Sequence, residues 1–176
     1  MSDRLSQRIE SVAELLVHAL ELEHQSAECY RQLAQALAVH HNHAAAALFG
    51  LLADMSDARA SAVMARAEGV SLPEIAPWDF KWPAAGSPQI DCDHVEISYL
   101  MTPLQALEVC LDKETLGREF YVLVASESPA AGVRVLAAEM AEERRERVEL
   151  ILTWIRGERG VATRVPEDLD PPNLPG

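Results

Sequence analysis

Apolar residues recur at helical spacing in four long stretches, and these fall into two pairs with a long interruption between them. The stretches of the first pair are separated only near residues 40–43, and those of the second pair only near residues 126–129. The interruption, residues 70–102, is too rich in proline for a continuous helix, since it holds Pro73, Pro77, Pro83 and Pro88. The short links predict two antiparallel helical hairpins, and the long segment predicts a crossover that joins them into a four-helix bundle.

Helix boundary signals divide the chain further. Thr102, Pro103 and Gln105 form the pattern of a capping box with proline in the first turn, so a helix is predicted to begin there. The fourth stretch is predicted to end at Gly157, because glycine is common just past a helix C-terminus. The prediction is therefore one all-α bundle domain over residues 1–157, with the crossover at 70–102, and a flexible proline-rich tail over residues 158–176.

Three aromatic residues stand close together in the crossover: Trp78, Phe80 and Trp82. Large aromatic side chains gain most when they are buried against an apolar surface. We therefore expect them to pin the crossover to the bundle rather than to stack on a ligand.

Composition and charge argue against several classes of function. Of the 176 residues, 49% are hydrophobic but only 5% are aromatic, which favours helices packed through Ala, Leu and Val. The formal net charge of −13 argues against a nucleic-acid partner, because affinity for a phosphate backbone rests on Lys and Arg. No uncharged apolar run is long enough to cross a membrane, so no membrane association is expected.

The N-terminal residues and the cysteines indicate the compartment. The first ten residues alternate in charge and contain no apolar run, so they are not expected to act as a signal peptide. The three cysteines, Cys29, Cys92 and Cys110, are odd in number and scattered in spacing. This usage predicts reduced thiols rather than a disulfide framework, and it favours a cytoplasmic protein.

Charged residues interrupt the apolar stripes at positions where a bundle has its core. Glu23 and Glu114 lie in the first and third stripes, and each precedes a tyrosine, Tyr30 or Tyr121, by seven positions. Polar residues also lie on the second and fourth stripes, namely Ser56, Arg59, Arg144 and Arg147. Because an unpaired buried charge is costly, these groups must neutralise one another or bind an ion.

Two of these segments carry a family resemblance. The stretches LELEHQSAECY, ending at Tyr30, and LDKETLGREFY, ending at Tyr121, resemble helices one and three of rubrerythrin-type ferritin-like proteins. In that family the glutamate seven residues before the tyrosine is an iron ligand. The resemblance covers roughly residues 10–156 and implies a ferritin-like bundle. We do not expect the family's second, four-cysteine iron domain, because three scattered cysteines cannot build its site.

The chain departs from the family pattern on the other two helices. Leu52-Ala53 and Met140-Ala141 resemble the lead-in to the family's Glu-x-x-His, yet the following ligand positions hold Ser56 and Arg59 on one helix and Arg144 and Arg147 on the other. A guanidinium cannot be deprotonated to bind a metal, and its charge repels one. We therefore expect Arg59, Arg144 and Arg147 to replace the metal as counter-charge for Glu23 and Glu114.

This interpretation leads to a specific functional prediction. The predicted buried network comprises Glu23, Glu114, Arg59, Arg144, Arg147, Ser56, Tyr30 and Tyr121. The protein is expected to have lost its di-iron centre, to need no cofactor and to act as a non-catalytic binding or structural module. No catalytic residue is assigned. The resemblance, together with the aromatic surface of the crossover, also predicts a homodimer.

An alternative keeps the metal. A shift of one residue in the fourth helix would turn Glu143 and Glu146 inward, where they could bind a metal together with Glu23 and Glu114. The second helix could likewise offer Asp54 and Asp57. In that case the chain would be a di-iron oxidoreductase of the peroxidase or oxidase type, or an iron-binding protein.

Overall fold

The computed structural model describes residues 8–83 and 98–162, and within these ranges it contains four long helices and no strand. The helices are α1 (Val12–Val39), α2 (His43–Arg66), α3 (Pro103–Glu127) and α4 (Ala131–Ala162), with a short 3₁₀ turn, η1, at Pro77–Asp79. Helix α1 packs chiefly on α2, and α3 packs chiefly on α4. The predicted all-α, ferritin-like four-helix bundle of two hairpins is confirmed.

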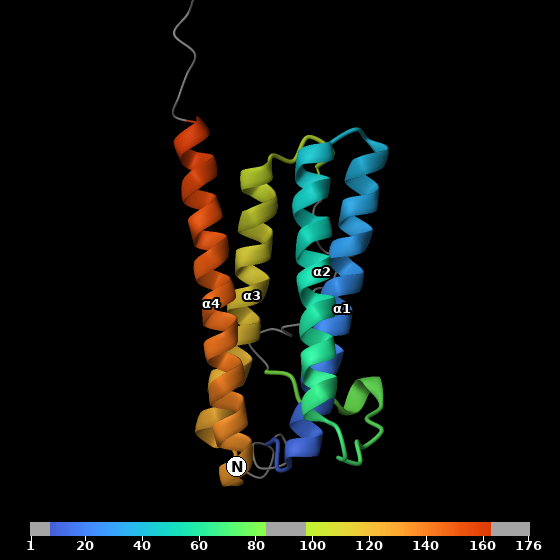
Figure 1. Ribbon diagram of the computed structural model, residues 1–176, viewed down its shortest axis with the longest axis vertical. Helices are drawn as coiled ribbons and strands as arrows, with labels where there is room; N and C mark the ends of the chain where they lie inside the picture. The colour runs from blue at the N-terminus through green and yellow to red at the C-terminus, as the bar shows by residue number, and fades with distance from the viewer. Residues whose placement is uncertain (1–7, 84–97, 163–176) are drawn as a thin grey trace, which may run out of the picture.

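The two hairpins are joined by a segment that begins at one end of the bundle and ends at the other (Figure 1). Figure 1 shows that α2 ends at the opposite end of the bundle from the start of α3. The chain that enters α3 is tied to the turn of the first hairpin, because the Asn42 side-chain amide donates to the carbonyl oxygens of Met101 at 2.6 Å and Tyr99 at 3.3 Å. Residues 84–97 of the predicted crossover lie outside the described residues.

Side-chain caps fix where the helices begin. Thr102 and Gln105 form the predicted capping box, with the Gln105 backbone N–H donating to Thr102 Oγ1 at 3.2 Å and the Thr102 N–H to Gln105 Oε1 at 2.9 Å. The predicted end of the fourth helix at Gly157 is wrong, since α4 continues to Ala162. A glycine ends a helix only where it adopts a left-handed conformation, and Gly157 does not have a positive φ angle. The proposed tail from residue 163 onward lies outside the described residues.

The apolar core consists of two clusters, one toward each end of the bundle. One is built around Leu15–Leu22 of α1 and Phe120 of α3, and the other around Leu33–Leu37 of α1 and Phe49 of α2. The predicted charged positions of α1, α3 and α4 fall between the residues of these clusters. The middle of the bundle is therefore the place where polar groups interrupt its core.

The crossover is fastened to the bundle through a buried histidine. His18 on α1 packs edge-on against Phe80 and Trp82, with ring centroids 4.9 and 5.1 Å apart, so two of the three predicted aromatic anchors are in contact with the bundle. The prediction is wrong for Trp78, which lies in η1 and is 83% exposed, since none of the residues of this 3₁₀ turn is buried. The Lys81 backbone N–H donates to His18 Nε2 at 3.0 Å, and His18 Nδ1 lies 2.8 Å from the Glu14 carbonyl oxygen, to which it donates as a neutral ring.

We expect this histidine to make stability depend on pH. Burial lowers the pKa of His18 from 6.5, although the carbonyl and carboxylate of Glu14 oppose the shift and the Lys81 ammonium adds to it. Below pH 6.5 the unfolded chain takes up a proton before the folded chain does, so the free energy of unfolding should fall as the pH drops from about 6.5 toward the folded pKa. Urea unfolding at pH 7.5 and 5.5 tests this, with His18→Gln as the comparison. If His18→Gln lost as much stability as the wild type between pH 7.5 and 5.5, His18 would not be the cause of the pH dependence.

The prediction that the cysteines are reduced holds for one described cysteine and fails for the other. Cys110 is a free thiol in the core, and burial raises its pKa. Cys29 is disulfide-bonded, so the prediction of three reduced thiols is wrong for this residue, because scattered spacing in sequence does not reveal which sulfur atoms meet in the fold. Cys92 lies outside the described residues.

In the described ranges no helix is long and apolar enough to cross a membrane. The cytoplasmic location stays a prediction.

Candidate functional site

The site is built around one guanidinium held between two buried carboxylates. Glu23 on α1, Glu114 on α3 and Arg144 on α4 are each only 1% exposed. Arg144 donates from Nη2 to Glu23 Oε1 at 2.6 Å and from Nη1 to Glu114 Oε2 at 2.5 Å. The side chain of Arg144 thus links three helices at the centre of the bundle.

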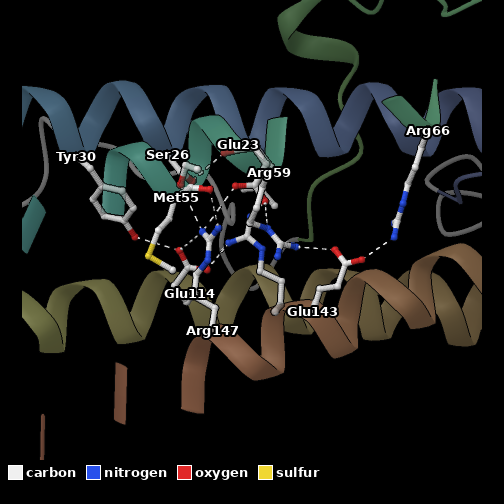
Figure 2. A network of polar contacts seen from close by, with 12 residues as sticks. Glu23, Ser26, Tyr30, Met55, Arg59, Arg66, Glu114, Glu143 and Arg147 are labelled. Atoms are coloured by element: carbon white, nitrogen blue, oxygen red, sulfur yellow. Dashed lines mark hydrogen bonds and ion pairs between the residues drawn. The ribbon is translucent and has the colours of Figure 1, made fainter. Parts of the chain in front are cut away.

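A second arginine ties the fourth helix to α2. Arg147 donates from Nη1 to Glu114 Oε1 at 3.0 Å, and the same nitrogen lies 3.8 Å from Glu23 Oε2. It also contacts α2, donating to Ser56 Oγ at 3.4 Å and to the Met55 carbonyl oxygen at 3.3 Å. Figure 2 shows Arg147 and Glu114 facing each other in the space between the helices. Ser56 therefore completes the hydrogen bonding of Arg147.

A third arginine leads from the buried centre toward the surface. Arg59 on α2 donates from Nε to Glu23 Oε1 at 3.1 Å and from Nη2 to Glu143 Oε2 at 3.1 Å. The other oxygen of Glu143 accepts from Arg66 Nη2 at 2.6 Å. Figure 2 shows this row of alternating charges running along the bundle. Exposure rises along it, from 1% at Glu23 to 21% at Arg59 and 40% at Glu143.

The two tyrosines lie beside the carboxylates. The Tyr30 hydroxyl donates to Glu114 Oε1 at 3.4 Å, whereas the Tyr121 hydroxyl makes no hydrogen bond within the described residues. Burial raises the pKa of both phenols, and the Glu114 charge adds to the effect at Tyr30. Both side chains are therefore neutral groups in the wall of the site.

Each carboxylate of this network is paired with at least two guanidiniums. Three carboxylates, those of Glu23, Glu114 and Glu143, meet four guanidiniums, those of Arg59, Arg66, Arg144 and Arg147. Burial alone would raise the pKa of Glu114, but Arg144 and Arg147 more than offset it and hold that pKa below its ordinary value. Burial likewise opposes the charge on Arg144, and Glu114 and Glu23 more than compensate by raising its pKa. Glu114 and Arg144 are therefore both charged in the folded protein at neutral pH.

A glycine makes room for the central guanidinium. A Cβ atom on Gly117 of α3 would lie 3.1 Å from Arg144 Nη1 and 3.3 Å from Arg144 Cζ. The guanidinium thus packs directly on the backbone of α3, one turn after Glu114. Gly117 was not among the residues predicted from the sequence, although a glycine in the interior of a predicted helix is a signal for such a close approach.

Comparison with known proteins places the chain in a family. No protein-family model matches it, and neither does any curated protein. A crystal structure of COG1633, an uncharacterized conserved protein from Magnetospirillum magnetotacticum MS-1, is 31% identical, with a TM-score of 0.63 over 84% of this chain and 95% of that chain. The chain belongs to the COG1633 family. The bundle is thus shared with an uncharacterized protein whose name assigns no chemistry.

In this COG1633 family member, the carboxylates that would have to join Glu23 and Glu114 in the alternative metal set do not gather at the centre. Glu146 and Asp54 are exposed, and Asp57 pairs with Arg31 at 2.6 Å on the surface. Glu143 is half-buried and is held by Arg59 and Arg66. In the part of the chain that the structure describes, no three residues among His, Cys, Asp and Glu are placed to hold a metal ion.

Gly117→Ala tests the packing of this family member's central arginine. Alanine normally stabilises a helix interior by about 1 kcal/mol relative to glycine. Here we expect the gain to be lost and the free energy of unfolding to fall by about 1–2 kcal/mol, because the new methyl group meets a guanidinium that two carboxylates hold in place. Gly50→Ala on α2, where a Cβ meets nothing within 4 Å, is the matched control and should be stabilising. If Gly117→Ala and Gly50→Ala changed the free energy of unfolding in urea equally, Arg144 would not pack against Gly117 as described.

Proposed function

We propose that this protein is a rubrerythrin-related, ferritin-like protein in which a Glu/Arg network stands in the place of a di-iron centre. On this proposal it acts as a non-catalytic binding or structural module. The observation that carries the proposal is the position of the Arg144 guanidinium, which bonds both Glu23 and Glu114, the two residues that the resemblance equates with iron ligands.

The donor set does not fit a pair of iron ions. A carboxylate-bridged di-iron site needs several anionic oxygens and neutral imidazoles around two cations. Here the two buried carboxylates are already bonded to Arg144, and Arg59 and Arg147 lie within hydrogen-bonding distance of them as well. A cation placed among these groups would meet three permanent positive charges. We therefore assign no chemical step to a metal in this protein.

The proposal is tested by metal analysis. Protein purified from cells grown with added iron is expected to contain no stoichiometric iron, because guanidiniums occupy the ligand positions. Elemental analysis of the purified protein provides the measurement, and its absorption spectrum should not change when peroxide is added.

Two irons per chain, with a spectrum that responds to peroxide, would overturn the proposal. The alternative of an active di-iron oxidoreductase would then have to be adopted, with rearrangement of the arginines on metal binding.

The proposal also includes a homodimer, since the described surface has large exposed apolar side chains such as Trp78 and Leu100.

A further inference from the structure

A pocket of about 260 Å³ opens beside the charged network and is lined by residues from all four helices. Its charged side chains include Arg59, Arg66 and Glu143, and Glu23 and Tyr121 also line it. Glu23 and Tyr121 are each 1% exposed, so the pocket reaches inward to the buried part of the site. This volume suits a small ligand rather than a nucleotide or a peptide.

One carboxylate of the protein itself lies at this pocket between two guanidiniums. Glu143 accepts from Arg59 at 3.1 Å through one oxygen and from Arg66 at 2.6 Å through the other, as Figure 2 shows. Glu143 is 40% exposed, so it can turn into water at little cost in solvation. Arg66 would then have no other ion-pair partner within the described residues, whereas Arg59 would keep Glu23.

The rest of the lining suits a short hydrocarbon chain and one acceptor. Val63 and Met140 line the pocket together with the small side chains of Ala58 and Ala62. The Tyr121 hydroxyl makes no hydrogen bond within the described residues, and burial keeps this phenol protonated. It is therefore a donor that a bound oxygen atom can use. Glu23 also lines the pocket, and its negative charge makes the inner end unfavourable for a multiply charged anion.

We propose that this pocket binds a small aliphatic monocarboxylate, whose carboxylate replaces that of Glu143 between Arg59 and Arg66. The hydrocarbon chain of the ligand lies against Val63 and Met140. Exchange of one carboxylate for another leaves the charge balance of the pocket unchanged. The planar carboxylate of the ligand can accept from the two guanidiniums in the same way as the planar carboxylate of Glu143 does. The inference rests on the proposed function, because Arg59 must remain the counter-charge of Glu23 for the pocket to exist in this form.

Titration calorimetry with butyrate tests the inference on four proteins: wild type, Glu143→Gln, Glu143→Gln with Arg66→Gln, and the control Glu142→Gln. Removal of the internal competitor in Glu143→Gln should tighten butyrate binding about tenfold, since two partly exposed ion pairs no longer have to be broken. The double variant should lose that gain, because Arg66 then offers no charge. Glu142→Gln changes the adjacent carboxylate, which pairs with Arg145, and should bind as the wild type does.

Equal affinity of wild type and Glu143→Gln for butyrate, or no binding by either, would overturn the inference. Tighter binding of inorganic phosphate than of butyrate by Glu143→Gln would also overturn it, since the ligand class would be wrong. Iron is measured on the same samples. An iron-free protein that does not bind butyrate contradicts only this inference, whereas two irons per chain contradict the proposed function.

Discussion

Arg144→Ala is expected to lower the free energy of unfolding by about 3–5 kcal/mol, the range typical of removing one partner of a buried ion pair. The change removes the group that bonds both Glu23 and Glu114, and each of these carboxylates is only 1% exposed. Glu114 keeps Arg147 and Glu23 keeps Arg59, but each loses its shortest charged contact. The measurement is urea unfolding at neutral pH.

Arg145→Ala is the matched control for this experiment. Arg145 is the next residue on α4 but points outward, where it pairs with Glu142 of the same helix. We expect little change in stability, because exposed ion pairs contribute weakly and solvent replaces the lost partner. If Arg144→Ala were no more destabilising than Arg145→Ala, the central position of Arg144 would be refuted.

The fold and the members of the charged network were predictable because both depend on periodicity. Apolar spacing along each helix identifies the buried face, and a charge on that face has to meet another charge in the core. Glu23 and Glu114 share such faces with apolar residues, as do Arg144 and Arg147 between Met140 and Ile151. The structure brings these four side chains together.

The partners within the network were not predictable, because pairing depends on side-chain geometry rather than on spacing. Glu143 was considered only as a metal ligand in a shifted register, yet it bridges Arg59 and Arg66. His18 was not singled out, because a single histidine on an apolar face carries no signal of the backbone N–H that it accepts from Lys81. Such contacts between distant segments arise only when the chain is folded.

The second large effect is expected from the pair of Arg147 and Glu114, which are 3.0 Å apart and buried. Arg147→Ala alone should cost about 3–5 kcal/mol, because it leaves part of the Glu114 charge uncompensated. Glu114→Gln alone should also be destabilising, because Glu23 is then the buried carboxylate that has to balance the charges of both Arg144 and Arg147. Glu114→Gln should lower the free energy of unfolding by less in the Arg147→Ala background than in the wild type. In that background Arg147, whose charge Glu114→Gln would otherwise leave without its partner, is already absent.

An exposed pair supplies the reference for this cycle. Arg31 and Asp57 lie 2.6 Å apart on the surface, at 44% and 50% exposure. Their coupling energy, measured with Arg31→Ala and Asp57→Asn, is expected to be about 0.2–1 kcal/mol. A short distance alone therefore does not produce strong coupling, and the comparison isolates the effect of burial.

If arginines serve as the counter-charges of the two buried glutamates, Arg147 and Glu114 must be energetically coupled, and a double-mutant cycle on Arg147→Ala and Glu114→Gln measures this coupling. The wild type, both single variants and the double variant are unfolded in urea under the same conditions. We expect a coupling energy of about 2–3 kcal/mol, clearly above that of the surface pair. Additivity of the two changes within about 0.3–0.5 kcal/mol would contradict it, because the two residues would then not share an interior site.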